Sequence, residues 1–497
     1  MPRDDHRSCV FDNTEEHWRL AFHMMPPGGV GSLNDPNGCC QFKGVYHMFH
    51  QYQPDFPNMY PRAWGHAWSK DLIHWHHTGL SIHEDSPFDY HGAFSGCSLI
   101  EDEGQTMRLF YTGNFKEPGK HDFIYEGRWA SQITTTTHDG IHFTPKRVVL
   151  LPQDYPDYVS CHVRDPKVWI RDNGDGHPFR MLLGARDRCD NGFIMVYNSE
   201  DKLHWKLHSV IRSAQHFGYM WECPDRMDFE DTYGKRHEFL AFCPQRNRRE
   251  AKIYENNHLS GYIPLSGDLL NTSIISEDKF IRWDNGFDFY APQTFVDDQG
   301  RSIMFGWMGL PDTPYLSRLP GLGFWQCITV PRLITMEDDG LLCAYPVPEL
   351  ERLRGNKAKR LKDSLIFSDH HADICIEEIK GNLKLTLDDA LEIFYESGIA
   401  GLRFIDTRVS GGRELRSCSV DHVSSVRVLI DGSTVEVFFN KGKTNFTSRW
   451  FPVADHLHVK IKGNYEEAQG WLMGDGMSAV RENKEAARKA RAGIQGI

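Results

Sequence analysis

The sequence predicts an all-β fold, a five-bladed β-propeller followed by a C-terminal β-sandwich, and two internal repeats support that prediction. In the first repeat, a small hydroxyl residue, any residue, Asp, two or three residues and an aromatic recur from Ser69, Thr137, Ser199 and Ser276. Self-similarity at such a period indicates one supersecondary unit copied around an axis. We expect each Asp to make turn hydrogen bonds and each aromatic to pack between blades, so we assign this repeat a structural role.

The second repeat is a polar or acidic residue followed at once, or after one residue, by Pro. Its five starts are Asp35, Ser95, Asp165, Glu222 and Tyr290, with Gly in place of Pro after Ser95. The segments that follow are short and strand-like, lie between Gly, Asn and Asp clusters, and show little 3.6-residue periodicity, which favours all-β over α/β. Five starts predict five blades, each a small sheet facing a central channel.

The same repeat predicts a cluster of carboxylates. The first strand of each blade lines the propeller axis, so Asp35, Asp165 and Glu222 would converge on one small volume. Each alone is an ordinary turn former, but three carboxylates in one pocket are costly unless they are protonated, bound to a cation or used in catalysis. Paired carboxylates serve glycoside hydrolysis or cation binding. The chain lacks the regularly spaced oxygen ligands of a calcium loop, which favours a glycosidase.

A second domain is predicted after the repeats. Alternating apolar runs at 426–430 and 433–439 flank Asp431-Gly432, a hairpin turn signal. We therefore expect an N-terminal arm at 1–20, the propeller at 21–350, a β-sandwich at 355–475 and a tail at 476–497 that forms a short surface helix or frays.

Composition restricts the partners. The net charge of -12 and sequence pI near 6.1 disfavour nucleic acid and anionic membranes. The charged start lacks the apolar stretch of a secretion signal, and no run of about eighteen apolar residues occurs, so we expect a cytoplasmic protein.

Twelve cysteines are too dilute for a disulfide scaffold and should be reduced thiols. His74, His76 and His77 follow a turn phrase that recurs without them, so we predict no metal there.

Five ordered phrases resemble glycoside hydrolase family 32, the invertases and fructan hydrolases. They begin at Asn34 (Asn-Asp-Pro-Asn-Gly), Phe94 (Phe-Ser-Gly), Arg164 (Arg-Asp-Pro), Glu222 (Glu-Cys-Pro) and Asp288 (Asp-Phe-Tyr-Ala-Pro-Gln-Thr-Phe). The similarity runs from about residue 22 to 350. A later phrase at 430–438, Ile-Asp-Gly-Ser-Thr-Val-Glu-Val-Phe, is similar to one in the family's C-terminal β-sandwich.

The resemblance implies hydrolysis of β-fructofuranosides with retention, through a covalent intermediate. Asp35 would be the nucleophile, Glu222 the general acid and base, and Asp165 the residue that binds ring hydroxyls and stabilises an oxocarbenium-like transition state. The first two roles need opposite charge states at one pH. We expect the Asn34 amide to favour the Asp35 anion, two neighbouring carboxylates to raise the pKa of Glu222, and Arg164 to hold Asp165.

The resemblance also implies residues that surround the fructosyl unit. They are Asn34, Gln51, Phe94, Ser95, Arg164 and Trp307, with Trp64 either in the pocket wall or behind it as a buttress. Many members carry a Trp wall where this chain has Met59, so either the thioether or a shifted Phe56 or Tyr60 takes that place, and the leaving-group preference is open. The mechanism requires no metal or other cofactor.

Several functions stay open at this point. Sucrose and short fructo-oligosaccharides are the expected substrates, and sucrose 6-phosphate hydrolysis or fructosyl transfer would use the same site. An inverting, arabinan-cleaving type of furanosidase and a sugar-binding propeller without turnover are more remote alternatives. A small sugar is the expected ligand, and a homo-oligomer is plausible without any motif that supports it.

Overall fold

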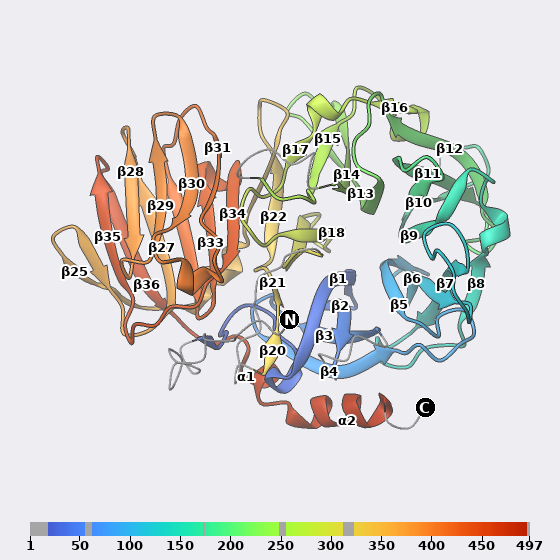
Figure 1. Ribbon diagram of the computed structural model, residues 1–497, viewed down its shortest axis with the longest axis horizontal. Helices are drawn as coiled ribbons and strands as arrows, with labels where there is room; N and C mark the ends of the chain where they lie inside the picture. The colour runs from blue at the N-terminus through green and yellow to red at the C-terminus, as the bar shows by residue number, and fades with distance from the viewer. Residues whose placement is uncertain (1–17, 55–61, 172–173, 248–254, 312–322, 495–497) are drawn as a thin grey trace.

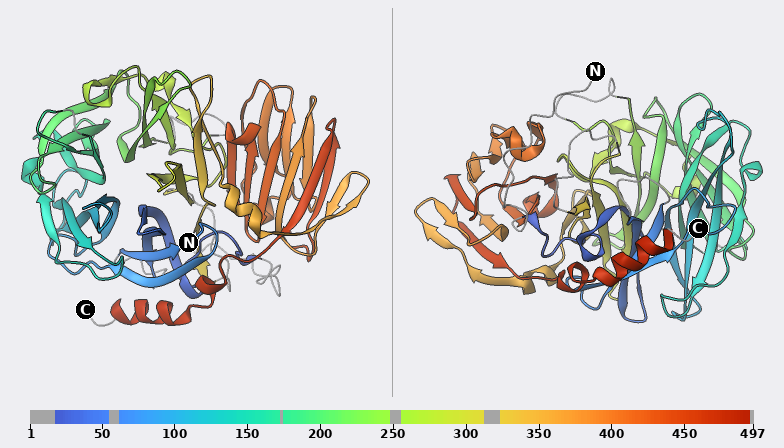
Figure 2. Two further views of the ribbon diagram at one scale, coloured as in Figure 1. Left: turned by 180° about the vertical axis from the view of Figure 1, so that it is seen from behind. Right: turned by 60° about the horizontal axis from the view of Figure 1, so that its bottom comes forward.

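The computed structural model describes residues 18–54, 62–171, 174–247, 255–311 and 323–494. Five β-sheets stand around a central axis, and two further sheets pack against each other beside them (Figure 1). Views from behind and from below show the same two-part arrangement (Figure 2). The predicted all-β fold, a five-bladed propeller followed by a β-sandwich, is confirmed.

The strands of the propeller follow the chain blade by blade, apart from two short strands that return to an earlier blade. The first blade contains β20 (Phe324–Trp325), β1 (Gly31–Phe42), β2 (Val45–Gln53), β3 (Ala63–Ser69) and β4 (Trp75–Ile82). The second contains β5 (Ala93–Glu101), β6 (Thr106–Lys116), β7 (Arg128–Thr137) and β8 (Arg147–Leu150). The third contains β9 (Val159–Ile170), β10 (Phe179–Asp187), β11 (Gly192–Ser199), β12 (Lys206–Ser213) and β16 (Ile274–Ile275). The fourth contains β13 (Met220–Glu230), β14 (Arg236–Gln245), β15 (Gly261–Pro264) and β17 (Ile281–Arg282). The fifth contains β18 (Tyr290–Val296), β19 (Ser302–Met308), β21 (Cys327–Ile328), β22 (Arg332–Met336) and β23 (Leu342–Pro346).

The sandwich has two antiparallel sheets. One contains β24 (Arg354–Lys357), β36 (Glu467–Met473), β27 (His371–Glu377), β32 (Val426–Asp431), β33 (Thr434–Phe439) and β34 (Thr444–Arg449). The other contains β25 (Lys359–Leu361), β26 (Ser364–Ile366), β35 (His458–Gly463), β28 (Leu383–Leu387), β29 (Leu391–Glu396), β30 (Ile399–Phe404) and β31 (Leu415–Ser419). The predicted hairpin is β32–β33, and its turn has Gly432 at φ +55°, where an added Cβ would lie 2.3 Å from the Arg19 carbonyl oxygen.

Helices are short and few in the described residues. They are η2 (Pro27–Gly29), η3 (Pro152–Asp154), η4 (Leu269–Asn271), η5 (Glu277–Lys279), η6 (Pro348–Leu353), η7 (Thr407–Ser410), η8 (Asn440–Gly442), α1 (Ser478–Arg481) and α2 (Lys484–Ile494). The helix α2 leaves the sandwich and lies along β4 on the outside of the first blade (Figure 1).

The first sequence repeat forms the predicted turns. In three of its four copies the Asp carboxylate accepts backbone N–H groups from the residues two and three positions ahead; these residues are Asp71, Asp139 and Asp201. The fourth copy forms the short helix η5 instead, because its additional residue lengthens the turn. The cysteines among the described residues are free thiols, as predicted.

The second repeat marks a β-bulge in the innermost strand of every blade. The pairing register shifts between Leu33 and Pro36, Ala93 and Gly96, Arg164 and Lys167, Glu222 and Asp225, and Tyr290 and Gln293. A bulge bends its strand and re-aims the side chains beside it, and Pro is tolerated there because its missing N–H breaks no ladder bond. The repeat therefore marks the same irregularity in the innermost strand of all five blades.

The register corrects one prediction. Asp35, Asp165 and Glu222 were expected at equivalent positions, but Glu222 lies directly before its bulge, where the neighbouring blades have Arg164 and Tyr290. Cys223, not Glu222, shares the bulge position and the positive φ of Asp165. Asp165 is followed directly by Pro, whereas Cys223 stands between Glu222 and its Pro. Glu222 therefore lies one position earlier in its strand than Asp165 does.

A late strand closes the ring. The short strand β20 follows the fifth blade in sequence but pairs in parallel with β1 of the first blade, joining Gly31 to Phe324 and Ser32 to Trp325. The innermost strand of the first blade is therefore completed from the opposite end of the propeller sequence (Figure 1).

A buried ionic cluster joins the propeller to the sandwich. His23 Nδ1 lies 2.8 Å from Asp431 Oδ2 and its Nε2 lies 2.8 Å from Glu436 Oε1, with all three side chains fully buried. Arg332 Nη2 contacts Glu436 Oε2 at 2.5 Å, and Arg332 Nη1 contacts Asp284 Oδ2 at 3.2 Å. Both ring nitrogens of His23 face carboxylate oxygens, so both must donate and the ring carries a proton. Burial opposes that charge, but the hydrogen bonds to Asp431 and Glu436 prevail and raise the pKa of His23 to about 9.

Two buried histidines inside the first blade are neutral, in contrast to the protonated His23. His77 Nδ1 accepts from the Gly79 N–H at 2.9 Å, its Nε2 lies 2.8 Å from His50 Nε2, and His50 Nδ1 donates to the Gln51 carbonyl at 3.1 Å. One proton on each ring satisfies this chain of bonds, so both rings are neutral. Burial lowers the pKa of His50 to about 4 and places the pKa of His77 well below its usual value.

These neutral rings predict sensitivity to acid. Their pKa values are lower in the folded than in the unfolded chain, so the stabilisation is present above the unfolded value of 6.5 and is lost as the pH falls toward about 4. We expect the urea midpoint to drop over that interval. The variant His77→Asn, which keeps an acceptor for Gly79, should weaken this pH dependence, whereas His76→Asn on the exposed side of β4 should not. If the urea midpoint of His77→Asn depends on pH as strongly as that of wild type, the buried rings are not the cause of the acid sensitivity.

Candidate active site

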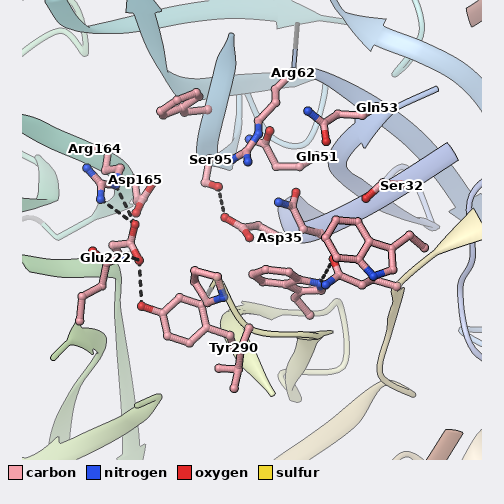
Figure 3. Close-up of a pocket in the computed structure, with 18 of the residues that line it drawn as sticks. Ser32, Asp35, Gln51, Gln53, Arg62, Ser95, Arg164, Asp165, Glu222 and Tyr290 are labelled. Carbon is pink, nitrogen blue, oxygen red and sulfur yellow. Dashed lines mark hydrogen bonds and ion pairs between the residues drawn. The ribbon is translucent and has the colours of Figure 1, made fainter. Parts of the chain in front are cut away.

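A cavity of about 290 Å³ lies where the five blades of the propeller meet, and Figure 3 shows its lining residues. Its walls come from the inner strands of all five blades and from the closing strand. The lining residues are Ser32, Asn34, Asp35, Gln51, Gln53, Arg62, Phe94, Ser95, Arg128, Arg164, Asp165, Glu222, Gln245, Tyr290, Trp307, Leu310, Pro311, Trp325 and Gln326. Three carboxylates from three different blades point into this one space.

Glu222 is the most tightly held of the three carboxylates. Arg164 donates to its Oε1 from Nε at 2.9 Å and from Nη2 at 2.7 Å. Its Oε2 accepts from the Tyr290 hydroxyl at 2.8 Å and from Gln245 Nε2 at 2.6 Å. Burial acts to raise the pKa of Glu222, but the Arg164 charge and these hydrogen bonds prevail and hold it below its ordinary value.

Asp35 and Asp165 have fewer compensating bonds. The Ser95 hydroxyl donates to Asp35 Oδ2 at 2.5 Å, and the Cys223 N–H donates to Asp165 Oδ2 at 2.8 Å. Burial is the main cause that raises the pKa of Asp35 to about 6, with the charge of Glu222 adding to it and Ser95 opposing it. Burial also raises the pKa of Asp165, against the nearby charge of Arg164.

The predicted order of the two pKa values was therefore wrong for this arrangement of the site. We expected the pKa of Glu222 to be raised above that of Asp35, whereas the pKa of Asp35 is raised and that of Glu222 is lowered. Burial is the main cause for Asp35, and Arg164 is the cause for Glu222. The guanidinium of Arg164 was expected to hold Asp165, its chain neighbour, but it reaches across to the next blade and binds Glu222.

Most of the predicted binding residues line the cavity: Asn34, Gln51, Phe94, Ser95, Arg164 and Trp307. Trp64 does not, because it is fully buried and donates from Nε1 to the Phe94 carbonyl at 3.0 Å, behind the wall. Met59, with Phe56 and Tyr60, lies outside the described residues. The functional roles of the lining residues stay predictions.

Sequence reasoning missed several lining residues. Arg62 lies with its guanidinium 6.0 Å from the centre of the Phe94 ring, and Arg128 enters at the start of β7. Gln245 ends β14 next to Glu222, and Trp325 comes from the closing strand. None of these positions belongs to a repeated phrase, so only the three-dimensional register brings them to the site.

Two features of the described residues bear on cofactors and membranes. The described residues contain no group of three or more His, Cys, Asp or Glu side chains arranged to hold a metal ion. None of their helices has the length and apolar character that crossing a membrane requires. The cofactor-free mechanism stays a prediction.

Comparison with known proteins gives a consistent result. The family model described as "Glycosyl hydrolases family 32 N-terminal domain" matches residues 23–346, and the corresponding C-terminal model matches 391–471. A sucrose-6-phosphate hydrolase from Bacillus subtilis is 31% identical over 465 residues, covering 90% of this chain and 91% of that protein. A raffinose invertase from Escherichia coli is 33% identical, covering 91% and 93%.

Solved structures agree with this. A sucrose-6-phosphate hydrolase from Lactobacillus gasseri has a TM-score of 0.81 at 26% identity, covering 93% of this chain and 96% of that one. A Bombyx mori beta-fructofuranosidase has a TM-score of 0.76 at 24% identity, covering 93% and 95%, which supports the fold. The resemblance of the sequence motifs is thus confirmed by whole-chain similarity, and the chain belongs to glycoside hydrolase family 32.

Proposed function

We propose that this glycoside hydrolase cleaves terminal β-D-fructofuranosyl units from sucrose and short fructo-oligosaccharides with retention of configuration. The observation that supports it best is the convergence of Asp35, Asp165 and Glu222 from three blades on one cavity of sugar size. Retaining glycosidases need two carboxylates on either side of the bond that breaks, one as nucleophile and one as proton donor.

In the proposed mechanism Asp35 attacks the anomeric carbon of the fructosyl unit while Glu222 donates a proton to the departing oxygen. The resulting fructosyl–Asp35 ester is hydrolysed when Glu222, now a carboxylate, takes a proton from water. Asp165 accepts hydrogen bonds from ring hydroxyls and stabilises the positive charge of the transition state. Trp307 and Phe94 supply apolar wall surface beside the sugar.

Hydrogen bonds from the bound substrate reverse the order of the pKa values of the carboxyl groups. Sugar hydroxyls that donate to Asp35 and Asp165 lower their pKa values, because hydrogen bonds to a carboxylate favour its anion. Sugar oxygens that accept from Arg164 compete with Glu222 and so raise the pKa of that residue. Glu222 then takes up one proton, from Asp165 or from solvent, as the fructosyl unit binds.

Sucrose 6-phosphate is the second candidate substrate. The guanidinium groups of Arg62 and Arg128 line the cavity, and guanidinium groups bind phosphate oxygens in a bidentate manner. Relatives with more than 30% identity are named for hydrolysis of this compound. Both substrates present the same fructosyl bond to the same carboxylates, so the second candidate changes only the leaving-group contacts.

A substrate panel tests both candidates. Turnover of sucrose, sucrose 6-phosphate, kestose and inulin should release fructose, with the β-anomer as the first product in an NMR time course. An inverted first anomer would identify an inverting furanosidase, binding without release of fructose would identify a sugar-binding propeller, and longer oligosaccharides at high sucrose would show fructosyl transfer.

The phosphate contact predicts a selective mutant. We expect Arg128→Gln to lower kcat/KM for sucrose 6-phosphate by roughly 10- to 100-fold, the effect of one lost charged hydrogen bond, and to change sucrose turnover much less. Arg128→Lys, which keeps the charge, should retain part of the preference. An equal loss on both substrates would assign Arg128 to the shared fructosyl site instead.

Two further proposals concern the setting of the enzyme. We propose a cytoplasmic location, because the cysteines among the described residues are free thiols, which a reducing compartment preserves. We propose that any protein partner is a second copy of the chain, which light scattering of the purified protein measures directly.

A further inference from the structure

The guanidinium of Arg164 is held from two sides. Two of its nitrogens, Nε and Nη2, donate to Oε1 of Glu222, and the third, Nη1, donates to Nδ1 of His162 at 2.7 Å. Residues 162 and 164 are two apart on β9, so their side chains lie on the same face of the strand. His162 therefore supports Arg164 from the side opposite the catalytic carboxylate.

The surroundings of His162 keep its Nδ1 atom a hydrogen-bond acceptor. Its Nδ1 receives the Arg164 hydrogen bond, so the ring is neutral with its proton on Nε2. Burial lowers the pKa of His162 to about 2, and the charges of Arg164, Arg128, Arg186 and Lys116 add to this. These groups face the ring from β9, β7, β10 and β6, so positive charge on four strands keeps a second proton off.

The other ring nitrogen, His162 Nε2, is buried and has no hydrogen-bond partner among the residues that the structure describes. The hydrogen bond from Arg164 is therefore the side-chain contact through which His162 would play a polar role.

We propose that His162 is a positioning residue for the acid/base carboxylate: it fixes the Arg164 guanidinium so that two N–H groups converge on one oxygen of Glu222. This rests on the proposed role of Glu222. Without the acceptor at Nδ1, Arg164 has lost one of its two anchors, and the Glu222 carboxyl group loses the alignment that proton transfer to the leaving oxygen requires. The remaining contacts from Tyr290 and Gln245 hold only Oε2.

The test compares substitutions that keep or remove the acceptor. In His162→Asn the amide oxygen takes the place of Nδ1, whereas His162→Leu has similar bulk and no acceptor. We expect His162→Leu to lower kcat/KM for sucrose by roughly tenfold or more, chiefly through kcat, because sucrose needs a proton on its leaving oxygen. With nitrophenyl β-fructofuranoside, whose leaving group needs no proton, the loss should be less than about threefold.

Two further measurements separate positioning from a structural role. His162→Asn should recover most of the sucrose rate, and His162→Leu should cause little extra loss in an Arg164→Gln background, because its effect passes through Arg164. Equal losses on both substrates, additive losses with Arg164→Gln, or no recovery in His162→Asn would each overturn the proposal. If His162→Leu does not fold, His162→Gln, which shifts the acceptor to the Nε2 position, takes its place with the same expectation.

Failure of this inference is distinguishable from failure of the proposed function. If Glu222→Gln keeps near-normal sucrose turnover, the acid/base assignment is wrong whatever His162 does. If Glu222→Gln loses turnover on sucrose but His162→Leu does not, only the positioning role is lost.

Discussion

Replacing Asp35 with Asn should reduce kcat/KM for sucrose by roughly 10⁴-fold or more, the scale seen when a covalent nucleophile is removed. Asn has the same shape and can still accept the Ser95 hydrogen bond through its amide oxygen, but it cannot form the fructosyl ester. The fold should be unharmed, because the substitution removes one of three mutually repelling carboxylates in a buried site. Initial rates, together with a thermal melt of each variant, measure both expectations.

A trapping experiment and a control variant test the nucleophile assignment further. In Asp35→Asn no fructosyl adduct should appear at residue 35 by intact-protein mass spectrometry, whereas rapid quenching of wild type with an activated fructoside should trap one. The control Ser95→Ala removes the hydroxyl that contacts Asp35 and keeps the carboxylate, so its loss should be far smaller. Near-normal turnover by Asp35→Asn would falsify the nucleophile assignment.

Removing His23 should destabilise the protein by about 3–5 kcal/mol, the cost of leaving a buried charge without its partner. His23 bridges Asp431 and Glu436 in the sandwich, and all three side chains are fully buried. In His23→Leu both carboxylates lose a charged donor in a place that water does not reach. We expect a lower thermal midpoint and a lower urea midpoint, with activity lost where the two domains separate.

The control and the pH dependence follow from the same geometry. Lys460→Gln breaks an exposed ion pair with Asp389 and should change stability by less than about 1 kcal/mol. The folded pKa of His23, about 9, lies above its unfolded value, so its stabilisation is full below 6.5 and is lost as the pH rises through 9. If the stability of His23→Leu and its sensitivity to alkaline pH match those of wild type, the buried ionic cluster does not stabilise the interface.

The sequence predicted the parts of the structure that local chemistry decides. The repeated Asp turns form with hydrogen bonds to the nearest backbone N–H groups, so their phrase marks the blades without reference to the rest of the chain. The Pro repeat likewise predicts the inner strands, because a bulge there accepts Pro. Asp35, Asp165 and Glu222 were therefore found together from spacing alone.

What the sequence did not predict depends on neighbours in other blades. The direction of the Arg164 side chain decides which carboxyl group has its pKa lowered, and Glu222 lies one position earlier relative to its bulge than Asp165 does. Gln245 and Arg128 reach the cavity from second and third strands, where no repeated phrase marks them. His162 has no signal beyond lying two residues before Arg164.

The parallel pair between β20 and β1 also affects the order in which the enzyme is assembled. Ser32 and Trp325 are paired across this seam, and both lie in the wall of the cavity. During synthesis the first blade emerges long before residue 325, with the inner edge of β1 still unpaired and available to other chains. The catalytic pocket is therefore completed only near the end of propeller translation, and a truncated nascent chain would have all three carboxylates but an open seam beside them.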